Sequence, residues 1–141
     1  MEGSFRPRQP GLRKLLGDLE AAIMEVVWAQ PPGALLTVRD VYETLLDERK
    51  VAYTTVMTVM GNLAKKQLLE VEKQGTAYLY RAPMTKDEFT SRAVGDIVNE
   101  LVSDFSSAAL AHFARAIETR PESADALAEL KRRIDEAKQK E

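Results

Sequence analysis

The residues best suited to chemistry lie in the stretch from Tyr53 to Lys66. It contains three threonines, one asparagine and two lysines but no carboxylate. Hydroxyl and amide groups donate and accept hydrogen bonds at base edges, whereas ammonium groups pair with phosphates. The stretch is therefore suited to binding a polyanion such as DNA. The candidate contact residues in it are Thr54, Thr55, Thr58, Asn62, Lys65 and Lys66.

A helix followed by a hairpin is predicted to present these side chains. Apolar residues recur with helical spacing at positions 56, 59, 60 and 63. After residue 69 the period changes to two, and Gln74-Gly75-Thr76 interrupts two runs of strand formers. This layout is typical of a winged helix, whose helix enters the DNA major groove while the ribbon lies along the backbone. The wing adds four candidate contacts with DNA, which are Lys73, Thr76, Tyr78 and Arg81.

A first helix is predicted from Leu16 to Gln30, with Pro31-Pro32-Gly33 ending it. Trp28 is predicted to anchor the core at the end of this helix. The buried stripe is predicted to comprise Leu19, Ile23, Val26 and Val27.

Leu35-Leu36 is predicted to be a very short strand that pairs with the wing. A second helix then begins at Thr37, because Thr37-x-x-Asp40 approximates a capping box. Thr37 and Arg39 either hold a phosphate at the helix N-terminus, or simply cap the helix and face solvent. The inward-facing residues are predicted to be Val38, Val41, Tyr42, Leu45 and Leu46.

The C-terminal part is predicted to be helical and to carry more apolar surface than it can bury alone. Thr85-x-x-Glu88 is a capping box, a bend is predicted at Ser106-Ser107, and a last helix at 124–138 follows Pro121-Glu122-Ser123. Surplus apolar surface favours self-association, although these helices could instead fold back onto the first domain. The candidate dimerisation residues are Phe89, Val94, Ile97, Val98, Leu101, Val102, Phe105, Leu110, Phe113, Ile117, Leu127, Leu130 and Ile134.

Composition supports a small soluble protein with two functional parts. The 141 residues are 45% hydrophobic and 30% charged, without an apolar run long enough for a membrane span or a signal peptide. Residues 1–83 carry 11 basic and 10 acidic side chains, whereas residues 84–141 carry 9 and 12. The predicted parts are a flexible basic arm at 1–14, a winged-helix DNA-binding domain at 15–83 and a helical dimerisation domain at 84–141. The arm either has no role or contacts phosphate weakly.

Catalytic and metal chemistry is not predicted. The chain has no Cys, and its only His, His112, lies between apolar neighbours in a predicted helix. A transition-metal site is therefore not expected, and neither a phosphate-binding glycine loop nor a nucleophile motif occurs. The absence of Cys also indicates the cytoplasm. We expect a protein that is not an enzyme and needs no cofactor.

Three segments resemble the BlaI/MecI penicillinase-repressor family: LGDLEAAIMEVVW, TVRDVYETLL and YTTVMTVMGNLAKKQLLEVEKQGTAYLYRAP. The resemblance extends through the helical tail, over roughly residues 15–138. It implies a homodimeric winged-helix repressor that binds inverted repeats upstream of β-lactamase or penicillin-binding-protein genes. It also implies that a membrane β-lactam sensor triggers proteolysis of the repressor in its dimerisation region.

The sequence departs from that family at two informative places. The family's scissile Asn-Phe pair corresponds to His112-Phe113 here, which is the candidate cleavage site, and a frequent cation of the recognition helix is replaced by Asn62. A neighbouring copper-responsive branch uses C-terminal Cys pairs, which this chain lacks. The hypothesis is therefore a repressor of β-lactam-resistance genes. The alternative is a winged-helix module whose third helix binds a protein partner.

Overall fold

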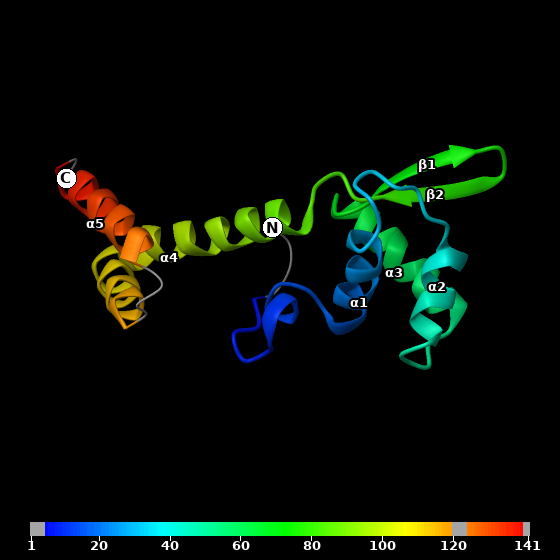
Figure 1. Cartoon of the computed structure of the whole chain (residues 1–141), viewed down its shortest axis with the longest axis horizontal. Coiled ribbons are helices and arrows are strands. Elements are labelled where there is room, and N and C mark those ends of the chain that lie inside the picture. The colour runs from blue at the N-terminus through cyan, green and yellow to red at the C-terminus, as the bar shows by residue number, and fades with distance from the viewer. Residues whose placement is uncertain (1–4, 120–123, 140–141) are drawn as a thin grey trace. The chain divides into compact units, whose positions relative to one another are not determined.

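A computed structural model of the chain describes residues 5–119 and 124–139. The chain divides into two compact units, Met1–Ala93 and Val94–Glu141. Its elements in chain order (Figure 1) are η1 (Gly11–Lys14), α1 (Asp18–Trp28), α2 (Val38–Leu46), α3 (Tyr53–Lys65), β1 (Glu70–Gln74), β2 (Ala77–Arg81), α4 (Lys86–Glu118) and α5 (Ala124–Gln139). This order of three helices and a hairpin confirms the predicted fold class, which is mainly α with a small β-wing.

The core of the first unit is formed by α1, α2 and α3. The side chains that are at most 1% exposed are Ile23, Met24, Val41, Leu45, Val56, Met60, Leu63 and Leu69. Fully burying a side chain of this type contributes roughly 1.5–3 kcal/mol. The helical spacing of apolar residues therefore predicted most of this core correctly.

Two residues of this region depart from the predicted pattern. Met24 is fully buried although the predicted stripe of the first helix omitted it. Leu46 is 45% exposed, so its predicted inward orientation is wrong. Val41 and Leu45 are four residues apart and occupy the buried side of α2, which leaves the next position, Leu46, turned toward solvent.

The second helix begins as predicted. Thr37 Oγ1 accepts a hydrogen bond from the Asp40 backbone N–H at 3.0 Å, and Asp40 Oδ2 accepts one from the Thr37 N–H at 2.9 Å. These reciprocal bonds satisfy two of the N–H groups that a helix start leaves unpaired.

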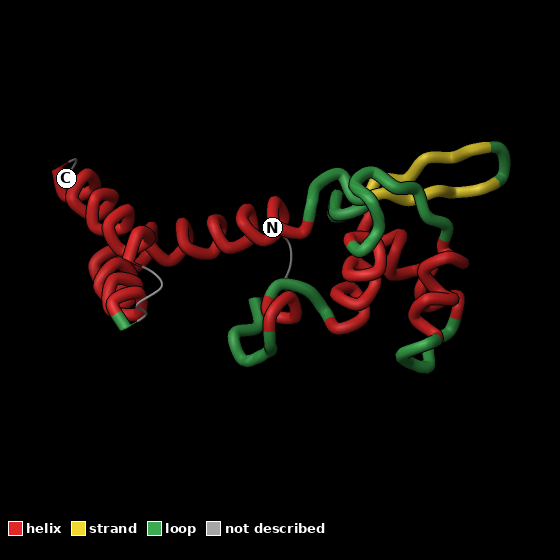
Figure 2. The backbone as a smooth tube through the Cα atoms, in the orientation of Figure 1, coloured by secondary structure: helices red, strands yellow, loops and turns green. Residues whose placement is uncertain are grey.

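The wing is a two-stranded antiparallel hairpin formed by β1 and β2, whose strands are yellow in Figure 2. Gln74 pairs with Ala77, so Gly75 and Thr76 form a two-residue loop. Gly75 has φ of +64°, a conformation in which glycine pays no steric penalty and which hairpin loops require. At the base of the wing, Leu36 exchanges two backbone hydrogen bonds with Tyr80 at 2.7 and 2.8 Å, which confirms the predicted short strand.

The chain that leaves the wing is fastened to the end of α1. Trp28 Nε1 donates to the Met84 carbonyl at 3.1 Å, and the Trp28 ring lies 5.5 Å from that of Phe89. Phe89 and Ala93 are buried in consequence. The first turns of α4 therefore belong to the first unit, whereas the sequence placed the start of the second domain at residue 84.

In the second unit, α4 continues to Glu118 and α5 follows. The backbone of Phe105 is non-helical, with φ of −138° and ψ of 49°, next to the predicted bend at Ser106-Ser107. The predicted break at Pro121-Glu122-Ser123 lies outside the described residues. Among the described helices, none has the length and apolar character that crossing a bilayer demands.

Candidate nucleic-acid interface

The outer face of α3 carries the hydrogen-bonding side chains that the sequence singled out. Thr54, Thr55, Thr58, Asn62 and Lys65 are all exposed, opposite the buried Val56, Met60 and Leu63. The Thr58 hydroxyl donates to the Thr54 carbonyl at 3.0 Å. Since a hydroxyl has one proton, Thr58 is left to accept hydrogen bonds, for example from a base amino group.

The N-terminus of α3 is open to an anion. Its N-cap is Ala52, which provides no side-chain cap, and the first turn contains no acidic residue. The unsatisfied N–H groups and the positive end of the helix dipole favour a phosphate there. The Arg39 guanidinium stands 5.7 Å from the Tyr53 ring centroid, and Tyr42 packs edge-on against the same ring at 5.4 Å. This contact holds a cation beside the start of α3.

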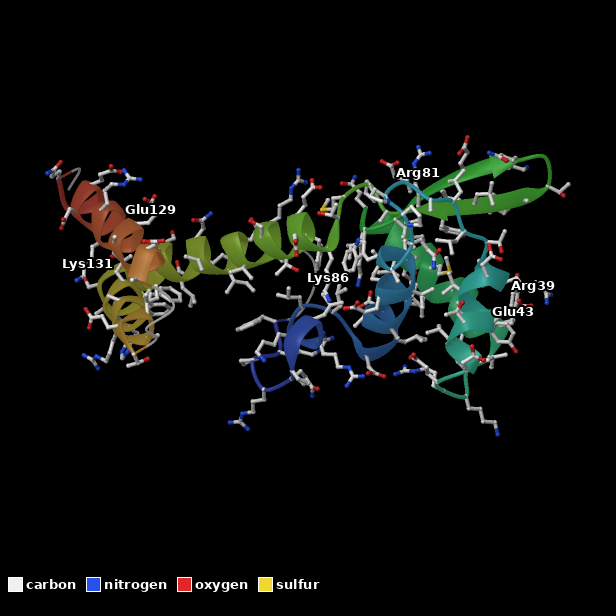
Figure 3. The ribbon with its side chains drawn as sticks, viewed as in Figure 1. Arg39, Glu43, Arg81, Lys86, Glu129 and Lys131 are labelled. Carbon is white, nitrogen blue, oxygen red and sulfur yellow. The ribbon has the colours of Figure 1, made fainter. Side chains whose placement is uncertain are left out.

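Arg39 is exposed and only loosely paired. It and Glu43 extend from the same helix, α2 (Figure 3), with 3.6 Å between the closest side-chain atoms. An exposed pair one helical turn apart contributes at most about 0.5 kcal/mol, so a phosphate competes with it easily. Thr37, by contrast, is occupied by its capping role.

Lys66 does not lie free on the interface as the sequence suggested. Its ammonium group contacts Glu20 at 2.7 Å, which links the end of α3 to the first turn of α1. Burial raises the pKa of the Glu20 carboxyl, but hydrogen bonds from Lys66 and from the Gly17 N–H outweigh it and leave the pKa lowered. The neighbouring Lys65 is exposed, with no ion pair in the part of the chain that the structure describes.

The wing divides into a polar tip and a neutralised base. Near the tip, the Lys73 ammonium lies 5.7 Å from the Tyr78 ring, its cross-strand partner, and Thr76 is exposed in the loop. At the base, Arg81 contacts Glu70 at 3.1 Å and Glu72 at 3.6 Å. The label in Figure 3 marks Arg81 at the end of the hairpin away from the loop. The tip therefore presents a cation, and the base does not.

Two exposed side chains of α3 were not among the contact residues that the sequence predicted. Met57 is 46% exposed and Tyr53 37% exposed, both on α3. Neither residue was assigned from the sequence to the core stripe or to the contact face. The available signal was that Met57 falls outside the stripe of Val56, Met60 and Leu63, one position after a buried residue.

The predicted dimerisation residues of the second unit have mixed exposure. Val94, Leu101 and Phe105 are exposed, with Phe105 at 64%. The half-buried ones are Ile97, Val98, Val102, Leu110, Phe113 and Ile117. The side chains of Leu127, Leu130 and Ile134 lie outside the described residues. At the candidate cleavage site His112 is exposed, and the described residues contain no cluster of side chains that could hold a metal ion.

Comparison with known proteins identifies the family. The model of the family described as "Penicillinase repressor" matches residues 16–136, most of the chain. The chain belongs to the penicillinase repressor family. Two proteins named transcriptional regulator BlaI, from the CDC 1551 / Oshkosh and H37Rv strains of Mycobacterium tuberculosis, are similar to this chain. Each is 38% identical to it over 113 residues, which cover 79% of both chains.

The solved structure described as the solution structure of the DNA-binding domain of the repressor BlaI is also similar. It is 22% identical, covers 50% of this chain and 83% of its own chain, and superposes with a TM-score of 0.44. The family assignment and the winged-helix arrangement together make the protein a DNA-binding regulator of transcription and a repressor. It acts by occupying DNA and not by catalysis.

Proposed function

We propose that the chain acts as a homodimer in the cytoplasm and binds inverted-repeat operator DNA, with α3 of each copy in the major groove. The observation that carries this proposal is the exposed face of α3, which is free of carboxylates and begins at an uncapped N-terminus. The width of the major groove admits one α-helix, and each base pair presents a distinct set of donors and acceptors there.

Base contacts are assigned to the polar side chains on the outer face of α3. An asparagine can form two hydrogen bonds with adenine, and threonine accepts from amino groups or packs its methyl against thymine. Replacing the asparagine or one of the threonines should therefore remove the preference for a particular base at one or two base pairs. The residues assigned to bases are Thr54, Thr55, Thr58 and Asn62.

Phosphate contacts are assigned to groups that have no strong internal partner. Arg39 stands at the start of α3, Lys65 lies at its end, and Lys73, Thr76 and Tyr78 lie on the wing. Lys66 and Arg81 are left out, since carboxylates already bind both.

Dimerisation is assigned to the second unit. Exposed apolar side chains on α4, such as Leu101 and Phe105, are costly in water unless another surface covers them. We assign the covering surface to a second copy of the same chain, because a two-fold axis pairs identical patches and matches a palindromic operator. Phe89 is left out of this surface, because Trp28 buries it within the chain.

The target genes we propose are those for β-lactamase and related β-lactam resistance, in keeping with the family. Repression would end when the dimer is lost, either by proteolysis or by dissociation. A membrane β-lactam sensor is the proposed trigger, and His112-Phe113 the proposed bond, with His112 exposed on α4. Mass analysis of the repressor from β-lactam-treated cells tests this. A chain that stays intact while its genes are induced would refute the proteolytic route.

Selection of bound sequences from a random DNA pool tests the DNA-binding proposal. The full-length chain should enrich an inverted repeat, and its affinity should fall steeply as salt rises from about 50 to 200 mM. Thr58→Ala and Asn62→Ala should relax sequence preference, whereas Lys73→Ala should weaken binding to all sequences and reduce the salt slope by about 1 per half-site. No binding at low salt would instead favour a protein-interaction module.

A further inference from the structure

Gly61 occupies a position where the fold itself does not require glycine. It lies inside α3 with helical backbone angles, and glycine is the least favourable residue in a helix interior after proline. A Cβ built at this position would meet no heavy atom within 4 Å among the described residues, apart from the helix's own backbone. Among the described residues, no packing contact therefore accounts for the missing side chain. Glycine at this position allows a group outside the chain to approach the helix backbone closely.

The surroundings of Gly61 on α3 are apolar on one side and polar on the other. Met57 precedes it by four residues and so lies one turn away on the same face, with 46% of its side chain exposed. Thr58 and Lys65 are the other neighbours on this face, at three and four residues' distance, and both are exposed. Met57, with its exposed thioether, and Gly61, which has no side chain, are here called the Met57–Gly61 notch, and the face around them bears hydroxyl groups and a cation.

The chemistry of the notch fits one group of the DNA major groove. The thymine C5-methyl is the apolar substituent that a base pair presents there, and it distinguishes thymine from cytosine. A thioether is flexible and polarisable, so it adapts closely to a methyl group. The lysine and threonines around the notch favour a nucleic acid over an apolar protein surface, because they leave its rim cationic and hydrogen-bonding.

We propose that the Met57–Gly61 notch receives the C5-methyl group of one thymine in each operator half-site. This inference rests on the proposed function, since it requires α3 to lie in the major groove. It assigns a specificity role to two residues that carry no hydrogen-bonding side chain. Both residues act by close apolar contact, and glycine allows the base edge to approach the helix backbone.

Replacing each thymine of the selected operator by deoxyuridine tests the proposal, because this change removes only the methyl group. At one position per half-site the wild-type affinity should fall about fourfold, the factor that corresponds to burying one methyl group. For Met57→Ala the ratio of the affinity for the thymine operator to that for the deoxyuridine operator should fall toward one at that position. Leu46→Ala removes an apolar side chain of the same exposure, 45%, from α2 and should leave the difference unchanged.

Gly61→Ala provides the second arm. The added methyl fits the fold and improves the helix, so the melting temperature should rise by a few degrees. It also fills the notch, so binding to the thymine operator should weaken roughly tenfold while the effect of deoxyuridine decreases. Ser91→Ala, at an exposed position of α4, also improves helix propensity, though by less than Gly61→Ala, and should not alter DNA binding because it does not touch α3.

The outcomes separate the notch from the proposed function. A wild-type chain that binds no DNA overturns both. A chain that binds its operator, but equally well with thymine or deoxyuridine at every position, overturns the notch alone. The same holds if Gly61→Ala binds DNA as the wild type does, which would mean that the glycine faces some other partner.

Discussion

The assignment of Lys66 to the fold and of Lys65 to DNA can be tested by exchanging each for alanine. The two residues are neighbours in sequence and identical in type. Lys66 contacts Glu20 at 2.7 Å, with 31% and 18% of the two side chains exposed. Lys65 is exposed. Lys66→Ala should therefore destabilise the protein, whereas Lys65→Ala should weaken DNA binding.

The magnitude for Lys66→Ala follows from the partial burial of the pair. An exposed ion pair contributes about 0–1 kcal/mol, and breaking a fully buried one costs about 3–5 kcal/mol. Glu20 keeps its hydrogen bond from the Gly17 N–H at 3.0 Å, so it is not left wholly unsatisfied. We expect a loss of about 1–2 kcal/mol of unfolding free energy for Lys66→Ala and less than about 0.5 kcal/mol for Lys65→Ala.

The effect of pH has a definite sign. The folded pKa of Glu20 is lowered, because the hydrogen bonds from Lys66 and Gly17 outweigh the opposing effect of burial. The ionised pair therefore contributes fully above the ordinary carboxyl pKa, and the contribution is lost as pH falls through the lowered value. The stability difference between wild type and Lys66→Ala should be largest near neutral pH and should shrink in acid.

Urea unfolding measures the change in unfolding free energy, and a salt titration measures the change in DNA binding. Lys65→Ala should reduce the salt slope by about 1 per half-site, whereas Lys66→Ala should leave it unchanged. A double-mutant cycle with Glu20→Gln isolates the coupling between the pair. The reasoning would be refuted if Lys66→Ala kept full stability but reduced the salt slope of DNA binding. The pairing with Glu20 would then be irrelevant to the fold.

Three further predictions concern other contacts of the chain. Phe89→Ala should cost about 3 kcal/mol of unfolding free energy in urea, because it empties a buried site beside Trp28; a weaker dimer at unchanged stability would instead return Phe89 to the dimerisation surface. Thr37→Ala removes the acceptor of the Asp40 N–H and should cost about 1 kcal/mol by the same method, without relaxing sequence preference in DNA selection. Phe105→Ala should raise the dimer dissociation constant about tenfold or more in sedimentation equilibrium, since Phe105 is 64% exposed; an unchanged constant would place the interface elsewhere.

Local signals in the sequence were sufficient for the elements and for most of the core. The capping box of Thr37 and Asp40, the turn that contains Gly75 and the helical spacing of Val56, Met60 and Leu63 all occur in the structure. Each depends on residues a few positions apart, whose steric and hydrogen-bonding preferences act before any tertiary contact forms. The polar face of α3 was predictable for the same reason.

The roles of the individual charges were not predictable in this way. Lys66 meets Glu20 from 46 positions away, and Lys86 meets Glu25 from 61 positions away. Nothing in the composition of residues 53–66 distinguishes Lys65 from Lys66. Their separation arises because successive helical residues point about 100° apart and only one of them faces α1.

The sequence by itself determined the family, the order of helices and wing, and which face of α3 is polar, because these depend on local periodicity and residue type. The tertiary structure decided which cations pair with carboxylates, that Phe89 is covered within its own chain, and that Met57 is exposed on α3. The physical reason is the same for all three. Burial and ion pairing are set by distant segments that only the folded chain brings together.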